Sequence, residues 1–131
     1  MLLKLTKNES KIFYNTISSE LGCVINEYDP DTGRKPSKKR IENGECAKNI
    51  IQTWEKLQPK INGSNFVNLD NIEACDIYLT DKEIEYTKTL LEKNIKECKK
   101  ELKSVTSPFT GVYAQVNEYV TEAGKIMNKF K

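Results

Sequence analysis

One local pattern constrains the fold more than any other, because it occurs twice and marks both a strand and a helix start. The two copies read Leu3-x-Leu5-Thr6-x-x-Glu9 and Ile77-x-Leu79-Thr80-x-x-Glu83. Alternating apolar residues are typical of a short strand. Thr-x-x-Glu is a capping box, in which the threonine hydroxyl and the glutamate carboxylate each accept from the other residue's backbone amide. The residues around the two copies do not align, so we interpret them as one device used twice. We expect the two short strands to pair with each other or with a hairpin.

Four segments repeat apolar residues at helical spacing, and each has signals that mark its ends. The first follows Thr6 and stops before Gly22, and the second stops before Pro59. The third follows Thr80, and its last turns are rich in lysine, as the helix dipole favours. The fourth begins near Pro108, because proline suits the first turn of a helix. The sequence therefore predicts helices over about 7–20, 44–58, 80–104 and 108–130.

The segments between these helices are predicted from their turn residues. Asp29-Pro30-Asp31-Thr32-Gly33 is typical of a turn and predicts a hairpin or protruding loop, with a basic stretch from 34 to 40 on its far side. Residues 62–65 read Asn-Gly-Ser-Asn and indicate a loop. Residues 68–74 fit a helical turn as well as an irregular segment, and residues 75–79 alternate as a strand does.

Length and composition fit one small helical domain. The chain has 131 residues, of which 37% are hydrophobic and 31% are charged. This length supports one core, and the charged fraction suits helices with solvated outer faces. We predict a single domain over residues 1–131, mainly α, with about four helices in a small bundle and an attached β-hairpin or short strands. An α+β fold is the alternative.

The start of the sequence and its hydropathy bear on location. The apolar part of the first residues is too short for a signal peptide, and no segment has the length of a membrane span. We expect a cytoplasmic protein without a membrane partner, whose four cysteines are reduced. With 21 basic and 19 acidic residues, the net charge of +2 does not by itself indicate a nucleic-acid-binding protein.

Conventional catalytic and metal-binding patterns are absent from the sequence. There is no histidine, no P-loop, no GxGxxG motif and no pair of closely spaced cysteines. Serine and cysteine nucleophiles usually need a histidine base, and structural zinc sites usually pair ligands two to four residues apart. We therefore expect no catalytic residue, no metal site and no cofactor. An enzyme with an unconventional carboxylate or lysine site remains an alternative.

Two regions are candidate binding sites. The last helix is apolar on more than one side, and a helix of that kind needs two partners. One partner is the core of this protein; the other is predicted to be another protein or a second copy in a homodimer, unless the helix is simply central in the bundle. The interface residues we expect are Tyr113, Val116, Val120, Met127 and Phe130. The leading hypothesis is a small non-enzymatic cytosolic binding protein of the inhibitor or adaptor type, a class that includes anti-defence proteins encoded by phages and mobile elements.

The basic stretch is the second candidate site. It contains five cations in seven residues: Arg34, Lys35, Lys38, Lys39 and Arg40. Such a cluster can hold a phosphate backbone or an acidic protein surface, although it also fits a solvated loop. The sequence therefore gives nucleic-acid binding through the 34–40 loop as the alternative function, with contacts to the backbone rather than to the bases.

Overall fold

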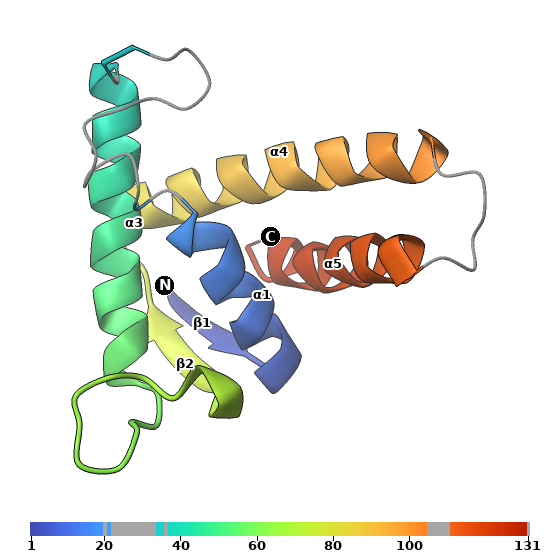
Figure 1. Ribbon diagram of the computed structural model, residues 1–131. Coiled ribbons are helices and arrows are strands. Elements are labelled where there is room, and N and C mark those ends of the chain that lie inside the picture. The colour runs from blue at the N-terminus through green and yellow to red at the C-terminus, as the bar shows by residue number, and fades with distance from the viewer. Residues whose placement is uncertain (20, 22–33, 36, 105–110, 131) are drawn as a thin grey trace.

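A computed structural model of the chain describes residues 1–19, 21, 34–35, 37–104 and 111–130. Within these residues, the structure has four helices and a sheet of two strands that lies at one edge of the molecule (Figure 1). The elements are β1 (Leu2–Leu5), α1 (Lys7–Ser18), α3 (Lys38–Lys56), a 3-10 turn (Leu69–Asn71), β2 (Cys75–Tyr78), α4 (Asp81–Ser104) and α5 (Gly111–Asn128). The prediction of a mainly α fold with four helices and short strands is confirmed.

Both capping boxes form as predicted. The Glu9 amide donates to the Thr6 hydroxyl at 3.2 Å, and the Thr6 amide donates to the Glu9 carboxylate at 2.8 Å. The same two bonds join Thr80 and Glu83, at 3.2 and 2.9 Å. Because each box satisfies amides that a helix start leaves without partners, α1 and α4 begin at the residue after the threonine.

The two strands pair with each other in an antiparallel ladder that sets Leu3 opposite Ile77. Side chains alternate across the ladder, so Leu3, Leu5 and Ile77 point into the core and are almost fully buried. Leu2 and Tyr78 form a cross-strand pair on the other face and are exposed. The pairing confirms one of the two expected arrangements. The hairpin predicted around residues 29–33 lies outside the described residues.

The prediction that the second helix begins at residue 44 is wrong, since α3 begins six residues earlier. Ser37 is the N-cap, and its hydroxyl accepts from the Arg40 amide at 3.2 Å. Lys38, Lys39 and Arg40 are therefore helical rather than part of a loop. The sequence hides this start because the first turn holds three cations and no acid, the opposite of what the helix dipole favours.

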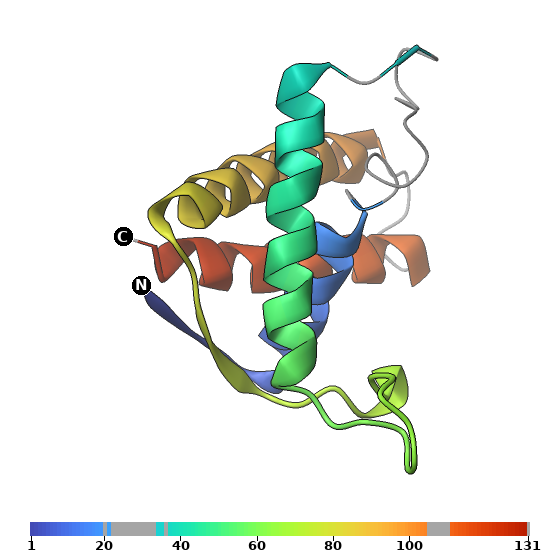
Figure 2. The ribbon, with the colours of Figure 1, turned by 90° about the vertical axis from the view of Figure 1, so that its left-hand side faces the viewer.

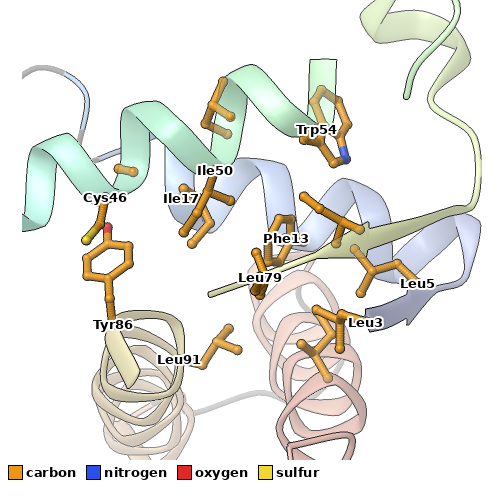
Figure 3. Packing of buried hydrophobic residues seen from close by; sticks show 14 of the residues in the cluster. Leu3, Leu5, Phe13, Ile17, Cys46, Ile50, Trp54, Leu79, Tyr86 and Leu91 are labelled. Atoms are coloured by element: carbon orange, nitrogen blue, oxygen red, sulfur yellow. The ribbon is translucent and has the colours of Figure 1, made fainter. Parts of the chain in front are cut away.

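The pair α4 and α5 forms one group of helices, and α3 crosses this pair. α4 and α5 run antiparallel side by side, and the crossing with α3 is steep (Figures 1 and 2). The core lies between these helices and the inner face of the sheet (Figure 3). Its largest fully buried side chains include Trp54, Phe13, Leu3, Ile17, Ile50, Ile77, Leu79, Leu91 and Ile126.

The Tyr119 hydroxyl connects three helices and gives a test of this packing. It lies 2.8 Å from the hydroxyl of Thr16 on α1 and accepts a hydrogen bond from the side-chain amide of Asn94 on α4 at 3.2 Å. Replacing Tyr119 by phenylalanine leaves the buried Thr16 hydroxyl without this partner. We expect the free energy of unfolding to fall by about 1–2 kcal/mol, measured by urea denaturation. Tyr78→Phe is the control, because its ring is exposed and its change should be close to zero; equal effects in both variants would contradict the assigned role of Tyr119.

Candidate binding sites

The loop from Leu57 to Ala74, between α3 and β2, is closed at its base by a buried glutamine. The Gln58 side chain accepts from the Glu73 amide at 2.8 Å and donates to the Glu73 carbonyl oxygen at 3.1 Å. The Asn68 amide also donates to the Pro59 carbonyl oxygen at 2.9 Å. The Gln58–Glu73 bonds join positions 15 residues apart, so the loop leaves and re-enters the fold at fixed points.

The outer half of the loop is ordered by its own hydrogen bonds. Lys60 and Val67 form an isolated antiparallel bridge, and the Ile61 amide donates to the Phe66 carbonyl oxygen at 2.9 Å. Gly63 turns the chain with a φ of 75°, a conformation that favours glycine. Figure 1 shows the loop projecting beyond the C-terminal end of α3. The segment is therefore a protruding loop with a defined shape.

Apolar side chains gather on this loop although it is exposed. Phe66 has 74% of its surface exposed, and three further apolar residues are 43–52% exposed. We refer to the exposed apolar side chains of this loop collectively as the Phe66 surface: Leu57, Ile61, Phe66 and Leu69. The sequence analysis identified the turn at 62–65 but no binding site there. The available signal was that apolar residues, Ile61 and Phe66, stand on either side of it.

The residues predicted as an interface on the last helix are all half-buried. Met127 and Phe130 pack against the buried cluster, which gives them a role within this protein. Tyr113, Val116 and Val120 lie nearer the N-terminal end of α5, the helix that runs beside α4. Each of the five retains some exposed surface, and an interface at this helix stays a prediction.

The predicted basic residues do not form one loop. Arg34 and Lys35 precede α3 and are exposed, and Lys38 and Lys39 are exposed in its first turn. Arg40 is half-buried and makes interactions with other residues. The structure brings Lys39 and Arg40 to the edge of a cavity, which the sequence did not indicate.

The cavity lies between the N-terminal half of α3 and the first three turns of α4 and has a volume of about 360 Å³. Lys39 and Arg40 line it from α3, and Lys82 and Lys93 line it from α4. Its wall includes Tyr86, whose ring is directed toward Cys46 in Figure 3. The cavity depends on how two helices cross, so neither helix alone shows it in the sequence.

The thiols of the described residues are poor nucleophiles. Burial is the largest cause that raises the pKa values of Cys46, Cys75 and Cys98. Cys75 also contacts the Ser10 hydroxyl at 3.8 Å, within a buried cluster that contains the Trp54 ring nitrogen. A raised pKa reduces the thiolate form that attacks substrates and binds metals. Among the described residues, no group of three or more cysteine or acidic side chains is placed to hold a metal ion.

No helix within the described residues is long and apolar enough to cross a membrane. No family model matches the chain, and comparisons with curated proteins and with solved structures gave no significant match. The Phe66 surface and the cavity between α3 and α4 are therefore the features from which a function is inferred.

Proposed function

We propose that this chain is a non-enzymatic binding protein that docks on another protein through the Phe66 surface. The observation that carries the proposal is the 74% exposure of Phe66 on a loop held by its own hydrogen bonds. Exposure of an aromatic ring to water raises the free energy of the protein, and this cost is relieved when a partner covers the ring. The ordered backbone adds affinity, because little conformational entropy is lost on binding.

The shape of the loop favours a different protein over a second copy as the partner. In a symmetric dimer the same patch must complement itself. The Phe66 surface lies on a projecting loop, and two convex loops bury little area against each other (Figure 1). A concave apolar pocket on another protein fits it better. This is the arrangement by which an inhibitor or adaptor loop occupies a cleft.

The apolar area of the Phe66 surface limits how tightly this surface alone can bind a partner. Its four side chains expose on the order of 400 Å² of apolar area, within the range of patches that monomeric proteins use for binding. A stable complex buries about 800 Å² on each partner, so polar residues around the loop must supply the rest. We therefore expect Phe66 to be an anchor in a mixed interface.

A site-specific cross-link would test this proposal. A photoreactive phenylalanine analogue at position 66, activated in cells of the native host, should cross-link to one defined protein. Binding of that purified protein should then weaken about 30-fold or more in Phe66→Ser, as expected for loss of an aromatic anchor. Calorimetric titration measures the change.

The matched control is Ile41→Ser, which removes an apolar side chain of 40% exposure on α3, outside the loop. It should bind like the unsubstituted protein. Equal affinity of Phe66→Ser and the unsubstituted protein would overturn the proposal. So would a cross-link from position 66 to a second copy of this chain, together with a dimer in light scattering that Phe66→Ser dissociates.

A further inference from the structure

The cavity between α3 and α4 is lined by more positively charged than negatively charged side chains. Four cations line it, against two acids, Glu42 and Glu85. Within the part of the chain that the structure describes, Lys39, Lys82 and Lys93 form no ion pair. Like charges around a partly enclosed space repel one another and raise the potential inside it. An anion in the cavity would remove that repulsion.

The cavity wall also contains uncharged and acidic side chains, which an anion alone would leave without contacts. Leu90 supplies half-buried apolar surface, and Tyr86 and Cys46, each only 9% exposed, add a small area beside it; burial raises the pKa of the Cys46 thiol, which keeps that thiol uncharged at neutral pH. The two carboxylates accept hydrogen bonds from hydroxyl or amino groups. The volume of about 360 Å³ is at the small end of ligand pockets.

We propose that this cavity binds a mononucleotide. The lysines and Arg40 hold its phosphates, Leu90 and the small exposed edge of Tyr86 contact its base, and the carboxylates of Glu42 and Glu85 accept from its ribose hydroxyls or amino group. A free inorganic phosphate would use only the cations. A polynucleotide would use the exposed lysines outside the cavity and leave the apolar wall uncovered.

This site is independent of the Phe66 surface. The cavity is at the N-terminal end of α3 and the loop follows its C-terminal end (Figure 1). A helix of 19 residues is about 28 Å long, so no side chain serves both sites. Loss of either activity by mutation should leave the other unchanged.

The test is an NMR titration of the full chain with ADP at low ionic strength, with adenosine, pyrophosphate and a single-stranded oligodeoxyadenylate as separate probes. ADP should shift amide signals of residues 39–46 and 82–93 and bind more tightly than adenosine or pyrophosphate. The double variant Lys39→Glu/Lys93→Glu should weaken ADP binding at least ~10-fold, because it replaces two attractions by two repulsions. Lys48→Glu is the matched control, since Lys48 is exposed on α3 and does not line the cavity.

A second variant separates the cavity from diffuse surface charge. Thr89→Phe changes no charge at an exposed lining residue, and its ring occupies part of the cavity. It should weaken ADP binding while the far-ultraviolet circular dichroism stays unchanged. The proposal is overturned if Thr89→Phe binds ADP normally, if pyrophosphate binds as tightly as ADP, or if only the oligonucleotide binds.

Discussion

Replacing Trp54 by alanine is expected to lower the free energy of unfolding by about 4 kcal/mol, the largest effect of any single substitution proposed for this protein. Trp54 is fully buried and stacks on Tyr14, with ring centroids 4.6 Å apart. Its ring nitrogen donates to the Ser10 hydroxyl at 2.9 Å (the ring is seen in Figure 3). The substitution removes the apolar contacts and the hydrogen bond together. Urea denaturation followed by circular dichroism is the measurement, because the variant has no tryptophan to report by fluorescence.

The Trp54→Phe variant separates the two contributions. It keeps an aromatic ring in the core but removes the N–H group, while the Gln58 amide still donates to the Ser10 hydroxyl at 3.4 Å. We expect a loss of about 1–2 kcal/mol, well below that of the alanine variant. A Trp54→Ala variant that loses less than about 1 kcal/mol would contradict the central place of Trp54 in the core.

The second large effect concerns a buried ion pair between α1 and the end of α5. The Lys129 ammonium lies 2.7 Å from the Glu9 carboxylate, and the Glu9 side chain is only 3% exposed. Burial raises the pKa of the Glu9 carboxyl, but bonds from Lys129 and Thr6 lower it by more, so the net pKa is below its ordinary value. Lys129→Met leaves the buried Glu9 carboxylate with Thr6 as its only partner among the described residues. We expect the free energy of unfolding to fall by about 2 kcal/mol at neutral pH, less than for a fully buried pair because Lys129 is partly exposed.

The same pair predicts a pH dependence of definite sign. A carboxyl whose pKa is lowered by folding stabilises the protein above its ordinary pKa of 4.5. That stabilisation is lost as the pH falls through the lowered value in the folded state. In Lys129→Met the difference from the unsubstituted protein should therefore be largest near pH 7 and should shrink on acidification below about pH 4.5.

Urea denaturation at a series of pH values measures this difference. The control is Lys125→Met, which removes the lysine of another α5 pair. Lys125 is 57% exposed and bonds Glu122 at 3.1 Å, so we expect a loss below about 1 kcal/mol. A Lys129→Met difference that stays constant from pH 7 to pH 3 would show that Glu9 does not depend on Lys129 for its ionisation.

The parts of the fold that were predictable from the sequence are those that local chemistry determines. The capping boxes fixed the starts of α1 and α4, because each box joins residues only three apart. The alternation of Leu3 and Leu5 fixed which face of β1 is buried. The start of α3 was missed, because Ser37 caps a first turn of cations that the helix dipole disfavours.

The candidate sites were less predictable, because both depend on contacts between distant residues. The Phe66 surface exists because Gln58 bonds the backbone of Glu73 and holds the loop closed. The cavity brings Lys39 to Lys93, and only the crossing of α3 and α4 places them together. The sequence did indicate two of the cavity cations, Lys39 and Arg40, but it assigned them to a loop.

The pairing of β1 with β2 also has a consequence for synthesis on the ribosome. Leu3 and its ladder partner Ile77 are separated by more than half of the chain. At about 5–20 residues per second, β1 leaves the ribosome several seconds before its partner strand exists. During that interval its backbone groups and apolar side chains have no native neighbour in the sheet. We therefore expect β1 to join the fold late, and during that interval residues 2–5 are an unpaired apolar segment to which chaperones can bind.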